Sequence, residues 1–415
     1  MKETKFKQTD IGLIPEDWNV VSLSSVIDEC NYGVGAEAVK FNGKIKYLRI
    51  TDIDDENHRY VPRPLASPSF YSEMYLAKVG DLFVARTGAS VGKSYLYNEN
   101  DGRLIFAGFL IKVHVSFANP YFVFLNTLTV HYKNWILSES ARTGQPGINS
   151  RQLKEFCFSL PPTKEEQERI ANALSQMDDL IAVLDEQIEK KKFIKQGAMQ
   201  QLLTGKTRLK GFTGEWKTVI LGKIGNTYNG ITGKTSADFG LGDAKYITFL
   251  NILNNPIIDT SLLEKVNISQ DERQNAVRKG DLFFNTSSET PEEVGICAVI
   301  MEEIDNLYLN SFCFGFRLFD ENVDGKYLAY FFRSKAGRDL MVTLAQGATR
   351  YNLSKSAFDK SEIVIPSDVD EQHAIANIFS TMDDEIQTLQ EERAKYALVK
   401  QGMMQQLLTG KIRLN

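Results

Sequence analysis

The chain has 415 residues, which is enough for two or three domains, each with a hydrophobic core of its own. Hydrophobic residues make up 43% and charged residues 24% of the sequence, and the formal net charge is −5. This balance is typical of a soluble globular protein and argues against one that coats nucleic acid through bulk positive charge, although it leaves room for locally basic loops.

Membrane segments, metal sites and disulfide frameworks are not indicated by the sequence. No run of eighteen apolar residues occurs, and the start MKETKFKQTD lacks the apolar stretch of a signal peptide, so we expect a cytoplasmic protein that does not contact a membrane. The four cysteines lack CxxC spacing, and the four histidines lack metal-ligand spacing such as HxxxH. We therefore expect buried free thiols and no metal.

Residues 1–160 alternate short β-branched and aromatic runs with Gly, Asn and Asp, which predicts strands separated by turns. The clearest strands are expected at 81–85, 94–97 and 109–115. Helical spacing follows over 121–138. We therefore expect a mixed α/β domain with a mostly antiparallel or mixed sheet.

The stretch 161–205 predicts one long amphipathic helix, because its apolar residues follow steps of three and four along one face. These residues are Ile170, Leu174, Met177, Ile181, Leu184 and Ile188. Pro161 stands just ahead, where proline blocks an earlier helix start, and Gly205 stands where a glycine commonly ends a helix. A helix from 165 to 203 would be about 58 Å long.

This helical stretch occurs a second time near the end of the chain. KQGAMQQLLTGKTRL at 195–209 returns as KQGMMQQLLTGKIRL at 400–414, and the apolar stripe returns with it. The second stripe contains Ile375, Phe379, Met382, Ile386, Leu389, Tyr396, Val399 and Met403. Each stripe must be covered, so we expect an antiparallel coiled coil between the two copies. Gly197 and Gly402 lie inside the helices at a cost of about 1 kcal/mol each, which suggests close packing or a bend there.

The block that follows the first helix repeats the first block more faintly. The matched segments are 15–23 with 214–221, 46–53 with 245–252, and 78–83 with 278–283. Helical spacing recurs over 326–344, and a strand is expected at 362–365. The predicted order is domain, long helix, domain, long helix, at 1–160, 161–205, 206–364 and 365–415.

Function is expected where the two frameworks agree but their loops differ, whereas the shared Gly80-Asp81 and Gly280-Asp281 are interpreted as scaffold. The loops at 85–94 and 142–151, with their counterparts at 285–290 and 346–355, carry side chains that can donate to phosphates and base edges. Strand ends near 49–52 and 248–251 form a third set. The first block's candidates are Arg49, Thr51, Arg86, Thr87, Ser90, Lys93, Gln145, Asn149 and Arg151. The second block's candidates are Lys234, Thr248, Asn251, Asn285, Thr286, Ser287, Gln346, Arg350, Tyr351 and Asn352. Polar loops of this kind are often merely solvated, so it stays possible at this stage that these loops contact no ligand.

The sequence contains no recognisable catalytic or cofactor-binding motif. The segment from Gly88 to Ser94 has three residues between its glycines, whereas a phosphate-binding loop needs four. No serine or cysteine stands in a nucleophile elbow or triad signature, so we assign neither a cofactor nor a catalytic residue. The repeated pairs Asp178-Asp179 and Asp383-Asp384 lie beside the apolar stripes, and we interpret them as a solvated or partner-binding face rather than an acid/base pair.

The whole chain resembles the specificity (S) subunit of type I restriction-modification systems. The resemblance is carried by Pro15-Glu16-Asp17-Trp18, Gly80-Asp81-Leu82-Phe83, Leu160-Pro161-Pro162, Glu166-Gln167, Ile170 and the two Leu-Leu-Thr-Gly-Lys segments. Each motif is weak alone, but their order and duplication are specific. The chain departs from the usual Pro-Pro-Leu pattern at Pro162-Thr163 and Pro366-Ser367, and His373 replaces a commonly charged residue.

The resemblance implies two similar mixed α/β target recognition domains, joined by two long antiparallel helices and related by an approximate internal twofold repeat. Each domain would read one half of an asymmetric, bipartite double-stranded DNA target, and the helices would set the spacing of the halves. The resemblance also implies partners: two methyltransferase subunits, which methylate adenine, and restriction subunits, which cleave DNA. The specificity subunit itself would be non-catalytic.

Two other classes of function remain as alternatives at this stage. A non-catalytic coiled-coil scaffold without sequence-specific DNA binding would need no divergent polar loops. A stand-alone DNA-modifying enzyme would need a cofactor motif, and none is recognisable in the sequence.

Overall fold

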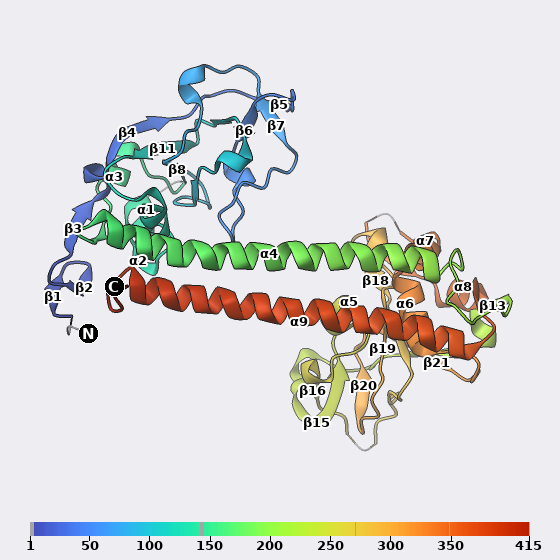
Figure 1. The fold of residues 1–415 in the computed structure, drawn as a ribbon. Coiled ribbons are helices and arrows are strands. Elements are labelled where there is room, and N and C mark those ends of the chain that lie inside the picture. Colours follow the sequence, from blue (N-terminus) through green and yellow to red (C-terminus); the bar gives the residue numbers. More distant parts are fainter. Residues whose placement is uncertain (1–3, 142–144, 270, 348, 415) are drawn as a thin grey trace. The chain divides into compact units, whose positions relative to one another are not determined.

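A computed structural model describes residues 4–141, 145–269, 271–347 and 349–414. The chain divides into two compact units, which we call unit 1 (residues 1–184 with 392–415) and unit 2 (residues 185–391). Two 39-residue helices, α4 (Lys164–Leu202) and α9 (Val369–Leu407), each contribute to both units (Figure 1). Within the described residues, no helix is long and apolar enough to cross a membrane.

Unit 1 is built on a four-stranded antiparallel sheet in the order β4-β11-β8-β9. Its strands are β4 (Ile27–Tyr32), β11 (Leu110–Val115), β8 (Asp81–Ala85) and β9 (Ser94–Leu96). Four strand pairs surround it: antiparallel β1 (Phe6–Thr9) with β2 (Gly12–Pro15), β3 (Asn19–Ser22) with β12 (Cys157–Leu160) and β5 (Ala38–Lys40) with β7 (Ala66–Pro68), and parallel β6 (Lys46–Leu48) with β10 (Leu104–Phe106). The shorter α-helices in the described part of the unit are α1 (Pro120–Asn126), α2 (Val130–Ser140) and α3 (Ser150–Lys154).

Unit 2 repeats this sheet in the order β14-β21-β17-β19. Its strands are β14 (Gly225–Asn229), β21 (Cys313–Leu318), β17 (Leu282–Asn285) and β19 (Cys297–Val299). Around it lie β13 (Trp216–Ile220) with β24 (Glu362–Pro366), β15 (Phe239–Ile247) between β16 (Glu264–Val266) and β20 (Leu307–Leu309), and β23 (Tyr351–Leu353) between β18 (Ser287–Ser288) and β22 (Ala345–Gln346). The helices are α5 (Phe249–Asn254), α6 (Gly325–Arg333), α7 (Lys335–Leu344) and α8 (Lys355–Lys360).

The strands expected from the sequence are therefore confirmed, and so is the mixed α/β class with parallel and antiparallel pairs. The helical spacing at 121–138 and 326–344 is also confirmed, and each stretch forms two helices. The hydroxyl of Thr129 caps α2 by accepting from the Tyr132 N–H, and Ser334 caps α7 by accepting from the Gly337 N–H. A hydroxyl that caps a new helix ends the continuity that apolar spacing alone suggests.

The core of each unit combines the start of one long helix with the end of the other. In unit 1, Ile170 and Leu174 of α4 pack in the same cluster as Leu407 of α9, together with Trp18 and Phe122. The equivalent cluster in unit 2 contains Leu202 of α4, Ile375 and Phe379 of α9, and the aromatic side chains Phe284, Tyr330 and Phe358. The start of each stripe is fully buried, whereas Val399 near the end of the second stripe is 44% exposed.

Each long helix is attached to its unit by a glutamine in its first turn. The Gln167 side chain donates to the Pro161 carbonyl (3.1 Å) and accepts from the backbone N–H of Asn119, which caps α1 (2.9 Å). Gln372 makes the same two contacts with Pro366 and with Asp324, the cap of α6. The repeated glutamine therefore ties each long helix to the helix that covers the central sheet.

The long helices also end alike, at Gly205 and Gly410, whose φ angles are +68° and +66°. This left-handed backbone conformation costs least at glycine, which explains the glycine in both LLTGK segments.

The acidic pairs on the long helices only partly fit the expected solvated or partner-binding face. Asp178 accepts from the Tyr121 hydroxyl and from Lys400 Nζ (2.5 Å), and Asp383 accepts from the Tyr330 hydroxyl (2.9 Å) and from Lys195. The prediction is therefore wrong for Asp178 and Asp383, whose carboxylates link the two long helices to α1 and α6. Their neighbours Asp179 and Asp384 are exposed.

Close packing at the two intrahelical glycines is also wrong, because a Cβ added at Gly197 or Gly402 would meet no atom within 4 Å. Alanine loses less backbone entropy than glycine in a helix. We therefore expect Gly197→Ala and Gly402→Ala each to raise the free energy of unfolding by about 0.5–1 kcal/mol, measured by urea denaturation. Gly410→Ala is the matched control and should lower stability, since its Cβ would lie 2.4 Å from Pro15 Cγ. Destabilisation by the two helical alanines would contradict this reading.

Candidate nucleic-acid interface

The shared Gly-Asp positions are scaffold, as expected. Asp281 is 1% exposed and accepts hydrogen bonds from the Arg317 guanidinium (2.6 and 2.8 Å), the Tyr228 hydroxyl (2.6 Å) and the Arg278 N–H (2.8 Å). Asp81 is fully buried and bonded to His114 Nδ1 at 2.8 Å. Asp81 also accepts from the Lys78 N–H at 2.9 Å. Each carboxylate therefore stabilises the turn that precedes β8 or β17.

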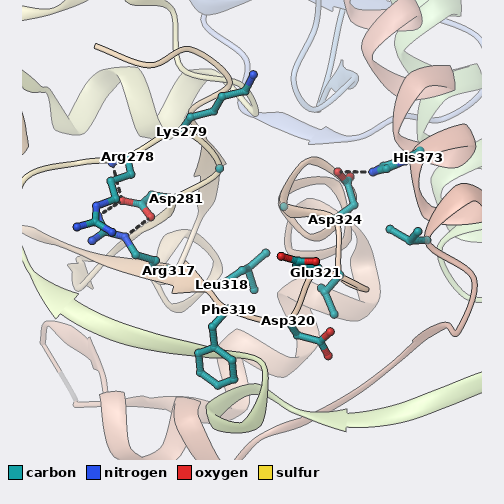
Figure 2. A pocket seen from close by; sticks show the side chains of 14 residues that line it. Arg278, Lys279, Asp281, Arg317, Leu318, Phe319, Asp320, Glu321, Asp324 and His373 are labelled. Carbon is teal, nitrogen blue, oxygen red and sulfur yellow. Dashed lines mark hydrogen bonds and ion pairs between the residues drawn. The ribbon is translucent and has the colours of Figure 1, made fainter. Parts of the chain in front are cut away.

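A pocket of about 460 Å³ lies beside Asp281 in unit 2 (Figure 2). Figure 2 shows Arg317 turned onto Asp281, while His373 pairs with Asp324 at 3.3 Å between Nε2 and Oδ2. The charges of Arg317 and Asp281 in this pocket therefore neutralise each other. Among the described residues, no group of three or more His, Cys, Asp or Glu side chains is placed to hold a metal ion.

Two of the predicted loop sets meet in unit 1. The Gly88 N–H donates to the Pro146 carbonyl (3.0 Å), the Ile148 N–H donates to the Arg86 carbonyl (2.9 Å), and Thr87 pairs with Gly147 in an isolated bridge. Residues 142–144 of the second loop lie outside the described residues. The remaining contacts place Arg86, Thr87, Gln145, Asn149 and Arg151 on one connected surface, which we call the unit 1 loop surface.

The counterpart loops meet in unit 2 as a small three-stranded sheet. Ser287 of β18 and Gln346 of β22 both lie opposite Asn352 of β23. Arg350 and Asn352 are exposed, and residue 348 lies outside the described residues. We call this sheet, with the adjoining Thr286, the unit 2 loop surface.

Several candidates in unit 1 already have intramolecular partners. Arg49 holds the buried carboxylate of Asp52 through Nε (2.8 Å) and Nη2 (2.6 Å). Lys93 Nζ donates to the Ile53 carbonyl (2.8 Å) and pairs with Asp55 (2.5 Å). Asn149 caps α3 by accepting from the Gln152 N–H at 2.9 Å. Each of these side chains therefore has a structural role, and contact with nucleic acid stays a prediction for it. Thr51 and Arg151 are exposed and Ser90 is half-buried.

The same is true of three candidates in unit 2. Asn285 is 1% exposed and bonds to the Glu293 carbonyl (2.9 Å) and the Ile296 N–H (2.6 Å). Asn251 is 2% exposed and donates to the Asp259 carbonyl at 2.8 Å, while Thr248 caps α5. The half-buried Tyr351 lies in β23 beside the exposed Arg350. The buried amides of Asn251 and Asn285 therefore differ from the exposed amides of Gln346 and Asn352 in burial, which the sequence does not reveal.

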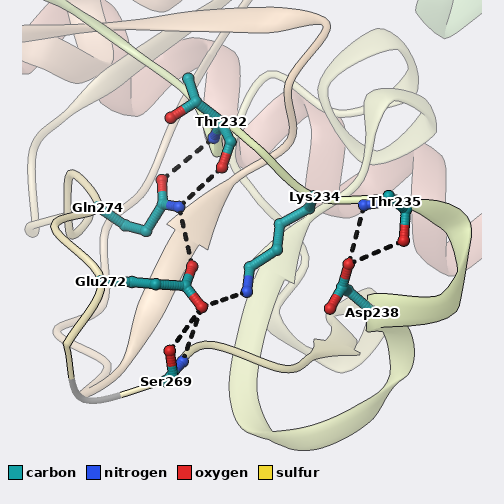
Figure 3. A network of polar contacts seen from close by, with 7 residues as sticks. All are labelled: Thr232, Lys234, Thr235, Asp238, Ser269, Glu272 and Gln274. Carbon is teal, nitrogen blue, oxygen red and sulfur yellow. Dashed lines mark hydrogen bonds and ion pairs between the residues drawn. The ribbon is translucent and has the colours of Figure 1, made fainter.

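Lys234 belongs to a polar network rather than to a loop surface (Figure 3). The Lys234 side chain is 8% exposed, and its amine lies 2.5 Å from the Glu272 carboxylate. Figure 3 shows Glu272 also accepting from the backbone and hydroxyl of Ser269 and from Gln274. The network closes the loop after β14 onto the loop after β16.

This network predicts a pH dependence of stability. The hydrogen bond from Lys234, followed by those from Ser269, lowers the pKa of Glu272 from 4.5 to about 2. Because the folded state holds the lower pKa, the ionised carboxylate stabilises unit 2 above pH 4.5, and this contribution disappears as the pH falls through about 2. Urea midpoints of wild type and Glu272→Gln should therefore differ most near neutral pH and converge on acidification. A difference that does not change with pH would contradict the assignment.

The comparisons with known proteins agree with this duplicated arrangement. A family model described as the type I restriction modification DNA specificity domain matches residues 15–191 and, a second time, residues 213–396. The chain belongs to this family. Both matches run from the start of a unit's β-rich part into one of the long helices.

Full-length relatives are found among the family's specificity subunits. The type I restriction enzyme MjaVIII specificity subunit of Methanocaldococcus jannaschii is 25% identical over an alignment that covers all of this chain and 97% of the relative. The fold matches the type I S subunit from M. genitalium with a TM-score of 0.61 at 15% identity, over 97% of this chain and 98% of that one. It also matches a chain from a study of complex assembly in the type I restriction-modification system, with a TM-score of 0.56 at 16% identity, over 96% and 99%.

Specificity subunits of this family are non-catalytic, and the family description implies DNA recognition. Sequence reasoning missed two side chains that the structure brings to the loop surfaces. Tyr32, at the end of β4, contacts both Arg86 and Ser150, and Asn229, at the end of β14, contacts Lys355. The pairs Tyr32–Ser150 and Asn229–Lys355 are 118 and 126 residues apart in the chain, and no local motif marks them.

Proposed function

We propose that this chain is the DNA-reading specificity subunit of a type I restriction-modification complex, and that each unit reads one half of an asymmetric, bipartite target. One observation carries the proposal: two units with the same strand order present loop surfaces of different composition at equivalent places. Equivalent frameworks can approach DNA in the same way, while different side chains read different bases.

We propose further that α4 and α9 act as an antiparallel coiled-coil spacer that relates the two units by an approximate twofold axis. Support comes from the mixed cores, in which each unit combines the start of one helix with the end of the other. Salt bridges between the helices recur in both units, as Lys400 with Asp178 and Lys195 with Asp383. A rigid spacer would fix the separation of the half-sites. In this arrangement 1–160 and 206–364 are the target recognition domains, and 161–205 and 365–415 are the spacer helices.

The partners follow from the proposed function. We infer that the chain binds double-stranded DNA together with two methyltransferase subunits and with restriction subunits, which would carry out the chemistry. A net charge of −5 is compatible with a shared interface, in which the partner subunits would supply further phosphate contacts. Duplicated units would offer equivalent docking positions to two copies of one partner.

The side chains we propose as readers are those that remain available on the loop surfaces. In unit 1 they are Arg86, Thr87, Gln145 and Arg151, with Ser90 of the same loop as Arg86, and in unit 2 they are Ser287, Gln346, Arg350, Tyr351 and Asn352. Thr286 is left out because its hydroxyl donates to the Phe312 carbonyl. Arginine can bind guanine through two parallel hydrogen bonds, and glutamine or asparagine can bind adenine in the same way.

Single substitutions test this proposal half-site by half-site. Arg86→Ala should lower discrimination by about 1–3 kcal/mol at one base pair of one half-site, and Arg350→Ala should do so in the other half-site only. Competition gel shifts of the chain with its methyltransferase subunits would measure this, using duplexes altered at one position at a time. Equal loss at every position would make these arginines phosphate contacts, and a wild-type complex with no sequence preference would overturn the function itself.

A further inference from the structure

The last residue of the outer strand occupies an equivalent place in each unit. Tyr32 of β4 lies opposite Ile111 of β11, which in turn lies opposite Val84 of β8. Asn229 of β14 lies opposite Phe314 of β21, which lies opposite Phe284 of β17. Because the two sheets have the same strand order, Tyr32 and Asn229 are counterparts.

Both counterparts brace the first residue of the short helix that follows the second recognition loop. The Tyr32 hydroxyl accepts from the Ser150 N–H (2.9 Å) and lies 3.2 Å from the Ser150 hydroxyl, and Ser150 begins α3. The Asn229 side-chain oxygen accepts from the amine of Lys355, which begins α8. We call each of these contacts, Tyr32 with Ser150 and Asn229 with Lys355, the brace of its unit. The brace is therefore part of the duplicated framework, but its side chains differ between the units.

Only the brace of unit 1 carries an arginine. The guanidinium carbon of Arg86 lies 4.6 Å from the centroid of the Tyr32 ring, a distance at which a cation is attracted to an aromatic face. The counterpart of Arg86 is Thr286, since each donates its N–H to the residue just before a central strand, Phe109 before β11 and Phe312 before β21. The carbonyls of Arg86 and Thr286 also accept in the same way, from Ile148 and Leu353. The Thr286 hydroxyl is turned inward onto the Phe312 carbonyl at 2.7 Å.

The backbone and side chain of Arg86 are both constrained. Its N–H and carbonyl bond to Phe109 (3.0 Å) and Ile148 (2.9 Å), so its backbone links the two loops of the unit 1 loop surface. Its Nε is buried without a hydrogen-bond partner in the described part of the chain. Within the described residues the Nη atoms of Arg86 also have no acceptor, so these donors remain for an external acceptor, and a side chain stacked on a ring loses little freedom on binding.

We propose that Tyr32 is a positioning residue that holds Arg86 for two-pronged recognition of a guanine in the half-site read by unit 1, and that unit 2 makes no such contact at the equivalent place. This inference rests on the proposed function and adds a base identity and a residue outside the recognition loops. Guanine is the expected base because its O6 and N7 acceptors match the paired donors of a planar guanidinium.

The test uses the complex of the full chain with its methyltransferase subunits and competition binding to the target duplex. The probes replace each guanine of the target in turn with 7-deazaguanine, which lacks the N7 acceptor. Wild type should lose about tenfold in affinity at one guanine of one half-site. Arg86→Ala and Tyr32→Leu should lose the sensitivity to 7-deazaguanine at that position, whereas Tyr32→Phe, which keeps the ring, should retain most of it.

Two comparisons separate positioning from a general structural role. Tyr32→Leu combined with Arg86→Ala should be no weaker than Arg86→Ala alone, because the ring acts through the arginine. Lys355→Met is the matched control in unit 2 and should leave the response to 7-deazaguanine in the unit 1 half-site unchanged. Additive losses, or a Tyr32→Leu loss spread over both half-sites, would overturn the inference while leaving the proposed function intact. A wild-type complex that binds target and scrambled duplexes equally would instead remove the proposed function.

Discussion

Replacing Trp18 with alanine is expected to lower the free energy of unfolding of unit 1 by about 3–5 kcal/mol. The side chain is fully buried in the unit 1 core. Arg413, near the end of the chain, lies over its ring at 5.7 Å, and a Cβ at Gly410 would touch the ring at 3.3 Å. The substitution therefore empties a space that the segment after α9 covers.

Trp216 provides the matched comparison in unit 2. It is only half-buried, with Arg208 over its ring at 5.8 Å, so Trp216→Ala should cost less. Hydrogen exchange under increasing urea would measure each unit separately, because a two-unit chain need not unfold in one step. Equal losses for the two variants, or a loss below about 1 kcal/mol for Trp18→Ala, would contradict the role given to the buried ring.

Arg413→Met is expected to destabilise unit 1 by about 3 kcal/mol. The guanidinium bonds to Glu166, at the start of α4, through Nη2 at 2.8 Å and also through Nε, and to both carboxylate oxygens of Asp17 at 3.0 Å. The Glu166 side chain is 6% exposed. Removing the arginine would leave a buried carboxylate without its charged partner, which costs more than the pair gains.

Two further variants test this ion pair: a second substitution that should restore part of the lost stability, and a control that breaks an exposed ion pair. Glu166→Gln added to Arg413→Met should recover part of the loss, since it removes the stranded charge. Lys192→Met breaks the exposed pair with Glu189 in α4 and should change stability by less than about 1 kcal/mol. Urea denaturation would report all three variants. A control loss as large as that of Arg413→Met would show that burial does not decide the effect.

The same ion pair is repeated in unit 2, which explains why arginine follows each LLTGK segment. Arg208 bonds to Glu371 through Nε and Nη2, both at 2.6 Å, and the Glu371 side chain is 1% exposed. Glu371 lies in the first turn of α9, as Glu166 lies in that of α4. We expect Arg208→Met to destabilise unit 2 in the same direction.

The long helices could be predicted from the sequence because their signals are local and repeated. An apolar stripe with steps of three and four, a proline ahead and a glycine behind predicted the bounds of α4 and α9 closely. The splits at Thr129 and Ser334 were missed, since a cap depends on a hydroxyl that spacing rules do not weigh. Close packing at Gly197 and Gly402 was wrong because a glycine inside a helix does not by itself show that another element lies close to it.

The candidate site was predictable only as a set of loops. Divergence between the two copies identified the loops around Arg86 and Arg350, and the structure joins each to its neighbour. Composition alone could not separate the buried amides of Asn251 and Asn285 from the exposed Gln346, because the same donors serve a fold and a ligand. The link from Tyr32 to Ser150 spans 118 residues and exists only after folding.

A map of methylated adenines, in cells that carry this gene with its methyltransferase gene, tests the central claim most directly. Two units with the same framework but different loop surfaces should yield two short, different sequence elements at a constant separation, with methylation dependent on both. A single uninterrupted motif, two identical halves, or methylation without sequence preference would contradict it.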